Sequence, residues 1–182
     1  MTEQSPGVRE AMVAAIPSLR AFAISLCGDP SLANDLVQET LLKAWANRDK
    51  FTMGTNLKAW LFTILRNTYF SEFRKSRREV QDVDGAAAAG LVSAPEQHGH
   101  LDMADFQDAL IKLSADQREA LLLVGAEGFS YEEASEIAGC AVGTVKSRVN
   151  RARVHLAELM GIKSADDNKI EVAPKVKAAR SV

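Results

Sequence analysis

The sequence predicts an all-α protein of two small helical domains joined by a flexible acidic linker. Apolar residues recur at three- and four-residue spacing along most of the 182-residue chain, and no stretch shows the strict alternation of a half-buried strand. Residues 79–100 break this pattern with a GAAAAG run, a proline and several acids. We therefore expect one domain over residues 6–78, the linker over 79–100, a second domain over 101–160 and a disordered tail over 161–182.

Composition limits the class of protein. With 47% apolar and 25% charged residues, the chain has the composition of a soluble globular protein. It shows no secretory signal pattern and no apolar run long enough for a membrane span, so we expect a cytoplasmic protein without a membrane partner. Cys27 and Cys140 lack metal-ligand spacing, and the three histidines form no convincing site. We expect no metal, no cofactor and no enzymatic activity.

Three helices are expected in the first domain. The first starts at Pro6 and ends near Gly28, with a kink or a restart at Pro17. The second covers about residues 30–48, and the third, which is very apolar, covers about residues 56–77. The core side of the second helix is expected to hold Ala33, Val37, Leu41, Ala44 and Trp45.

Two helix faces in this domain carry polar side chains. The face of the second helix opposite its core side holds Asp35, Gln38, Glu39 and Leu42, and an ordinary solvated surface would show the same pattern. One stripe of the third helix combines cations, an amide and an aromatic ring, at Thr63, Arg66, Asn67, Phe70 and Arg74. Arginines interleaved with rings suit single-stranded nucleic acid, because rings stack on unpaired bases while cations hold the backbone. The alternative is that the rings fill the core, which we favour for Trp60 and Phe73.

The second domain is predicted to contain a helix-turn-helix. Two helices are expected over about residues 101–124, the second of them opened by a capping box at Ser114. Ser130 and Glu133 form another capping box, and Gly139 permits a tight turn after the short helix that follows. The helix after this turn carries cations at Lys146, Arg148, Arg151 and Arg153. The pattern predicts a recognition helix for a DNA major groove; an amphipathic hairpin with a solvated basic face is the alternative.

The distribution of charge fits DNA binding better than the formal net charge of −2. Residues 58–78 and the recognition helix are basic, whereas residues 79–108 contain acids and no lysine or arginine. Two basic zones separated by an acidic stretch attract phosphate locally but create little overall field. We therefore expect the chain alone to bind DNA weakly, since nonspecific affinity grows with the number of phosphates neutralised.

Three blocks of the sequence resemble the extracytoplasmic-function sigma factors of bacterial RNA polymerase, and they occur in that family's order. The blocks are DLVQETLLKAW (35–45), NLKAWLFTILRNTYFSEFRKSRR (56–78) and FSYEEASEIAGCAVGTVKSRVNRAR (129–153). The resemblance covers roughly residues 16–78 and 106–159. Within the family, KAWANRDKF, GTNLKAWLFTILRN and most of the third block are similar to the EcfG-like subgroup, which serves the general stress response in alphaproteobacteria.

The resemblance implies three binding surfaces. In such sigma factors the outward face of the second helix binds the clamp coiled coil of the polymerase's largest subunit, here through Asp35, Gln38, Glu39 and Leu42. The third helix and the preceding loop capture a flipped-out base of the melted −10 element, here through Phe51, Thr63, Arg66, Asn67, Phe70 and Arg74. The recognition helix reads the −35 duplex, here through Ala141, Thr144, Lys146, Ser147, Arg148, Asn150 and Arg151. For Arg148 and Arg153, pairing with Glu132 and Glu136 is an alternative.

The resemblance also implies partners. These are core RNA polymerase, promoter DNA and a helical NepR-like anti-sigma factor, itself sequestered by a response regulator with a sigma-like domain. Two other functions are compatible with the residues: a freestanding helix-turn-helix regulator, which would bind duplex DNA as a symmetric dimer, and a sigma-mimicking protein that titrates an inhibitor. The chain shows no long dimerisation helix, and a mimic need not keep a basic recognition face. Packing of the acidic linker over the basic faces is a further hypothesis, for autoinhibition.

Overall fold

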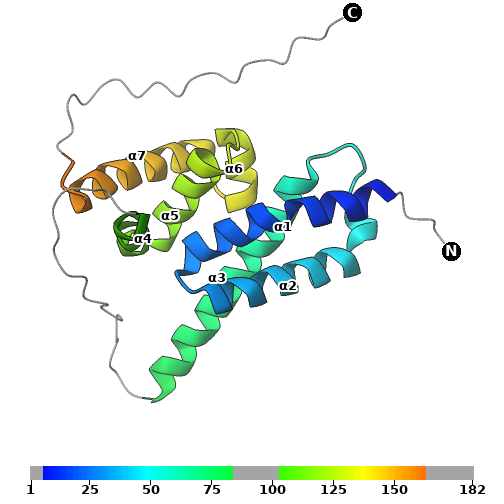
Figure 1. The fold of residues 1–182 in the computed structure, drawn as a ribbon, viewed down its shortest axis with the longest axis horizontal. Helices are drawn as coiled ribbons and strands as arrows, with labels where there is room; N and C mark the ends of the chain where they lie inside the picture. The colour runs from blue at the N-terminus through cyan, green and yellow to red at the C-terminus, as the bar shows by residue number, and fades with distance from the viewer. Residues whose placement is uncertain (1–5, 84–102, 163–182) are drawn as a thin grey trace, which may run out of the picture.

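The computed structural model describes residues 6–83 and 103–162, with side chains over residues 7–72 and 103–162. This part of the chain is helical and contains no strand, as predicted (Figure 1). The first domain consists of α1 (Pro6–Cys27), α2 (Pro30–Ala46), the 3₁₀ turn η1 (Arg48–Lys50) and α3 (Leu57–Val83). The second consists of α4 (Met103–Lys112), α5 (Ala115–Leu121), the π-helical turn η2 (Leu122–Ala126), α6 (Tyr131–Ala138) and α7 (Val142–Leu159). Most of the predicted linker and tail, residues 84–100 and 163–182, lies outside the described residues.

Local capping residues set the helix boundaries where the sequence predicts them. The Asp29 carboxylate accepts hydrogen bonds from two backbone amides in the first turn of α2, at 2.7 and 3.2 Å. Ser130 and Glu133 form the predicted capping box at the start of α6, with hydrogen bonds of 3.1 and 2.8 Å in the two directions. Gly139 ends α6 in the left-handed conformation, at φ 63°. The first helix of the helix-turn-helix, α6, is therefore delimited by local chemistry at both of its ends.

Replacing Ser130 by alanine should lower the free energy of unfolding by about 1 kcal/mol, because it removes the acceptor for the Glu133 amide. We expect a fall of roughly 2–4 °C in Tm, measured by circular dichroism. Ser135→Ala is the matched control, since the Ser135 hydroxyl donates only to the Glu132 carbonyl within its own helix, at 2.7 Å. Equal losses in the two variants would contradict a capping role for Ser130.

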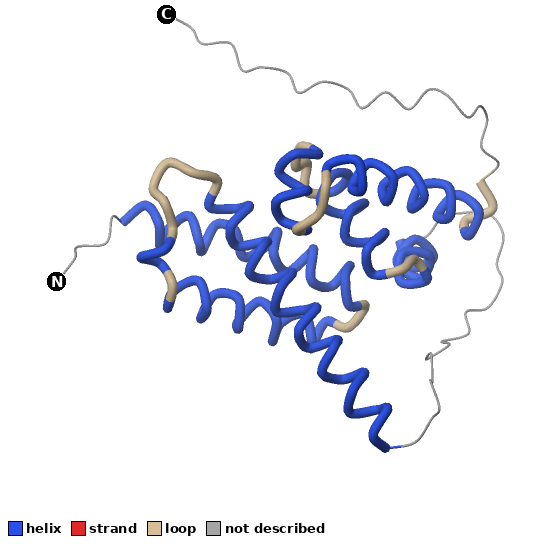
Figure 2. Tube along the Cα trace, turned by 180° about the vertical axis from the view of Figure 1, so that it is seen from behind, coloured by secondary structure: helices blue, strands red, loops and turns tan. Residues whose placement is uncertain are grey.

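Several element details differ from the predictions. α1 is continuous through Pro17, which is exposed, so water can replace the lost helical hydrogen bond there. α3 runs on to Val83, into the segment predicted as linker, and its C-terminal part extends away from the packed body (Figure 2). Trp45 is 43% exposed rather than part of the core. The buried side of α2 holds Ala33, Leu36, Val37, Thr40 and Ala44.

α1 is also more apolar than predicted. From Gly7 to Cys27 it is long and apolar enough to cross a membrane by length and composition alone. Part of its apolar surface is instead buried inside the protein, through Met12, Leu19, Phe22, Ala23 and Leu26, whereas Val13 is 59% exposed. The helix therefore serves as a core element of the first domain, where it packs against α2 and α3.

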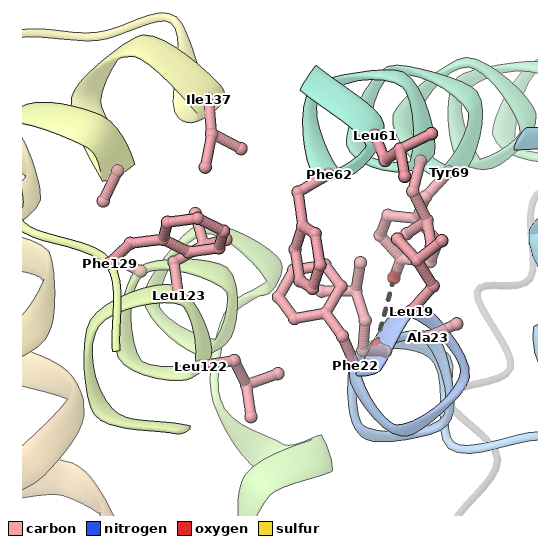
Figure 3. Close-up of a cluster of buried hydrophobic side chains, with 14 of the residues drawn as sticks. Leu19, Phe22, Ala23, Leu61, Phe62, Tyr69, Leu122, Leu123, Phe129 and Ile137 are labelled. Atoms are coloured by element: carbon pink, nitrogen blue, oxygen red, sulfur yellow. Dashed lines mark hydrogen bonds between the residues drawn. The ribbon is translucent and has the colours of Figure 1, made fainter. Parts of the chain in front are cut away.

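The two domains share one hydrophobic core. Phe62 of α3 lies between them, with its ring centroid 5.0 Å from that of Phe22 in α1 and 5.2 Å from that of Phe129 in the second domain (Figure 3). Leu122 and Leu123 of η2 belong to the same buried cluster. α3 packs against α6, and α1 packs against α4 and α5. The domains are thus closed on each other, an arrangement that the sequence did not predict.

Candidate nucleic-acid and protein interfaces

The outward face of α2 borders an apolar groove. Asp35, Gln38 and Leu42 are exposed as predicted, and Leu42 is 71% exposed. Glu39 is half-buried and pairs with Lys43, at 2.6 Å. The groove between α1 and α2 encloses about 700 Å³ and is lined by Arg9, Met12, Val13, Ile16, Gln38, Leu41, Leu42 and Trp45. The structure thus adds residues of α1 and Trp45 to the predicted surface, and an acidic rim beside an apolar groove can hold an amphipathic helix with basic flanks.

A second, more polar cavity lies between α2, η1 and α3. It encloses about 490 Å³ and is lined by Lys43, Asn47, Lys50, Trp60, Ile64, Asn67, Thr68 and Ser71. Asn67, a predicted site residue, is exposed within it. Phe51, also predicted, packs its ring against Trp60 with centroids 5.3 Å apart. Amides, two lysines and an aromatic ring around one cavity offer base-edge hydrogen bonds, stacking and phosphate attraction.

The predicted stripe on α3 divides into two parts. Asn67 lines the cavity, whereas Arg66 reaches the second domain and pairs with Glu119, with 2.9 Å between Arg66 Nε and Glu119 Oε1. The Arg66 guanidinium also lies over the Phe70 ring, 4.7 Å from its centroid. The Thr63 hydroxyl donates to the Ala59 carbonyl of its own helix, at 2.9 Å. The side chain of Arg74 lies outside the described residues, as does that of Phe73.

The recognition helix α7 presents a polar face to solvent. Val145, Val149 and Ala152 are buried against the rest of the domain. The predicted residues that are exposed are Ala141, Thr144, Lys146, Asn150 and Arg151, and Ser147 is half-buried. Ala141 is the N-cap residue and supplies no side-chain cap, so the first amides of α7 can bond an external acceptor. This face combines the cations Lys146 and Arg151, the side-chain amide of Asn150 and the backbone amides at the start of α7. Such groups can read base edges and hold phosphates in a major groove.

Arg148 differs from the other predicted residues of α7. It pairs with Asp116 of α5, with 2.8 Å between Arg148 Nη2 and Asp116 Oδ2, rather than with Glu132 or Glu136. Its other terminal nitrogen lies 3.6 Å from the Cys140 sulfur. Arg148 therefore ties α7 to α5, and this structural role competes with the predicted contact to DNA.

Two buried charged residues at the domain contact were missed from the sequence. Arg118 donates to three backbone carbonyls, those of Leu26, Ile111 (2.9 Å) and Leu113 (3.1 Å). Burial lowers the pKa of the Arg118 guanidinium. Burial likewise raises the pKa of the neighbouring Glu119, against the opposing effect of Arg66. One feature of the sequence could have indicated their burial: the pair comes directly before the apolar run ALLLV, residues 120–124.

Comparison with known proteins shows the family of this chain. Residues 12–79 match the model of Sigma-70 region 2, and residues 103–156 match that of Sigma-70 region 4. The ECF RNA polymerase sigma factor EcfG of Rhodopseudomonas palustris (strain TIE-1) is 61% identical over 160 residues, covering 88% of each chain.

Solved structures of other proteins share the fold of this chain. The sigma factor RpoE of Bartonella quintana, in complex with the anti-sigma factor NepR, matches with a TM-score of 0.78 and 55% identity, covering 88% of this chain and 100% of that one. The PhyRSL–NepR complex of Sphingomonas sp. Fr1 matches with a TM-score of 0.63 and 18% identity, over 98% of this chain and 99% of that one, which shows a shared fold alone. The chain belongs to the sigma-70 family, as an extracytoplasmic-function RNA polymerase sigma factor.

Proposed function

We propose that this sigma factor binds core RNA polymerase in the cytoplasm and directs promoter-specific initiation at general stress-response genes, without enzymatic activity of its own. The observation that carries the proposal is that regions 2 and 4 occur on one chain, where Asn67 lines a polar cavity and Lys146, Asn150 and Arg151 are exposed on α7. The 61% identity to EcfG supports the stress-response assignment. The exposed basic face of α7 argues against a sigma mimic, which would not need it.

The α1–α2 groove is the proposed site for the polymerase clamp. Asp35 and Glu39 provide negative charge next to exposed Leu42 and Trp45. A basic coiled coil would bury the apolar side chains in the groove while its cations face the carboxylates, and charge complementarity of this kind sets orientation and association rate. Gln38, which lines the groove, would supply a hydrogen bond at the centre.

The cavity beside α3 is the proposed −10 site. Asn67 can donate to and accept from the edge of an extruded base, while Trp60 and the adjacent Phe51 provide a ring surface. Lys50 would hold a flanking phosphate, as would Lys43 if it exchanges its ion pair with Glu39 for DNA, and the sequence did not assign this role to either residue. Extruding a base costs a few kcal/mol, so several such contacts are needed together.

The exposed face of α7 is the proposed −35 reader. Arg151, which is exposed, would contact a guanine or an adjacent phosphate, and Lys146 and Asn150 of α7 are exposed as well. Thr144, Ser147 and Ala141 lie toward the N-terminus of the helix, which is the end that enters the major groove in helix-turn-helix proteins.

A NepR-like helical anti-sigma factor is the proposed inhibitor. RpoE, which is 55% identical to this chain, was solved with NepR bound. Release of this inhibitor by a response regulator with a sigma-like domain is part of the proposal. The acidic rim and apolar groove on α2 would serve polymerase and inhibitor alike, so binding of one excludes the other.

Run-off transcription with purified core polymerase tests the proposal. Transcripts from stress-promoter templates should require this chain and should fall roughly ten-fold for Asn67→Ala and for Arg151→Ala, since a specific base contact contributes about 1–3 kcal/mol. Arg20→Ala, an exposed change on α1, is the control and should leave transcription unaltered. Tight binding to a palindromic duplex without polymerase, and no transcript, would instead establish a freestanding regulator.

A further inference from the structure

The contact between the two domains contains an unequal ion pair. Glu119 of α5 has no exposed side-chain surface, whereas its partner Arg66 of α3 retains 22%. A second pair, Lys58 and Glu127, lies at the edge of the contact at 2.8 Å, with Lys58 37% exposed. Because Arg66 belongs to the first domain and Glu119 to the second, separation of the domains would remove the hydrogen bond from Arg66 to the Glu119 carboxylate.

Glu119 is incompletely compensated for this burial. Its Oε1 accepts from Arg66, but its Oε2 has no hydrogen-bond partner among the described residues. Burial raises the pKa of Glu119 even with the guanidinium beside it, so loss of hydration outweighs the attraction of Arg66. A charge that loses its hydration without full compensation weakens the structure that buries it.

The proposed function requires the domains to separate. The −35 and −10 elements are, by their positions, roughly 25 base pairs or more than two helical turns apart, which is at least about 70 Å, whereas a compact body of roughly 140 residues is about 40 Å across. The closed packing also keeps Arg66, a predicted −10 contact, bound to Glu119. Opening therefore has to break this ion pair before the chain can engage both elements.

We propose that Glu119 is a release element, whose buried carboxylate keeps the closed packing of the two domains weak enough to open for polymerase and promoter DNA. Separation hydrates the carboxylate and frees Arg66 for a DNA phosphate. The inference rests on the proposed function in one respect, namely that the open state is the state that binds polymerase and promoter DNA. It differs from an ordinary salt-bridge latch, because the two partners of the pair have opposite effects on closure.

Zero-length carbodiimide crosslinking of the full chain measures closure without DNA. Lys58 and Glu127 are 2.8 Å apart across the domain contact and can be joined only in the closed state. Lys43 and Glu39 are 2.6 Å apart within α2 and serve as the internal reference. The ratio of the two crosslinked peptides by mass spectrometry, followed through urea concentrations below unfolding, gives the opening equilibrium.

Neutralising the two partners should move this equilibrium in opposite directions. We expect Glu119→Gln to make opening about ten-fold less favourable, because a neutral amide loses less hydration on closure, its oxygen can still accept from Arg66, and the partly exposed guanidinium keeps part of its own hydration. Arg66→Met should make it about ten-fold more favourable, because it leaves the carboxylate buried without a partner. Glu136→Gln and Arg20→Met, exposed changes of the same charge, are the controls. Increased opening in both pair variants, or no change with Glu119→Gln, would overturn the proposal.

Two further measurements keep the outcome unambiguous. If Glu119→Gln loses its helical circular dichroism signal, Glu119→Met tests the same loss of charge. With core polymerase, Glu119→Gln should lower run-off transcription several-fold. Unaltered transcription by a more tightly closed variant would overturn a role in release. Absence of transcription by the unmodified chain would count against the proposed function instead, and the crosslinking result would still decide what Glu119 does to closure.

Discussion

Replacing Phe62 by alanine is expected to lower the free energy of unfolding by about 3–5 kcal/mol, as for large aromatic-to-alanine changes in protein cores. The Phe62 side chain is fully buried and contacts the rings of Phe22 and Phe129, which belong to different domains. Lys58 also lies over Phe62 and Phe129, at 5.4 and 5.2 Å from the centroids. Removing the ring would therefore leave a cavity at the point where both halves of the core meet.

Thermal and urea unfolding followed by circular dichroism test this prediction. At roughly 2–4 °C per kcal/mol for a chain of this size, Tm should fall by about 6–20 °C. Phe62→Leu, which keeps most of the apolar volume, should lose far less, and Trp45→Ala, at an exposed ring, should change Tm little. A loss for Phe62→Ala no greater than that for Trp45→Ala would show that the two domains do not share the core described here.

Sequence alone predicted the features that depend on neighbouring residues. The capping box at Ser130 and the left-handed Gly139 each act within a few residues, and the structure contains both. The outward face of α2 and the exposed face of α7 follow from helical periodicity, which is also local. Family resemblance added what periodicity could not, namely a prediction of which face meets which partner.

Contacts between distant segments could not be predicted in this way. Arg66 and Asn67 are adjacent in a single stripe, yet one meets the second domain and the other lines a cavity, because three-dimensional packing divides the stripe. Trp45 looked apolar enough for the core but borders a groove. The pair at 118 and 119 reads as a solvated helix face, since charged residues are almost never fully buried. No local pattern shows that another domain covers it.

Replacing Arg118 by methionine is expected to cost about 3 kcal/mol of unfolding free energy. The guanidinium donates to the Leu26 carbonyl at the end of α1 and to the Ile111 and Leu113 carbonyls at the end of α4. Methionine keeps the apolar stem but leaves these buried acceptors without donors, and each unsatisfied buried group costs about 1–3 kcal/mol. The Tyr69 hydroxyl, 3.5 Å from the Leu26 carbonyl, would replace only part of the loss.

Urea unfolding of Arg118→Met, beside the exposed control Arg151→Met, measures this cost. The neighbours Arg118 and Glu119 are both buried charges at one domain contact, but their hydrogen bonding differs. Among the described residues, Arg118 has three carbonyl acceptors, with only its Nε unpaired, and holds helix ends of both domains, whereas Glu119 has one partner and an unpaired oxygen. Replacing Arg118 should therefore destabilise the closed protein, whereas neutralising Glu119 should make the closed packing of the two domains more stable. A stability loss below about 1 kcal/mol for Arg118→Met would contradict the principle that hydrogen-bond satisfaction decides the sign here.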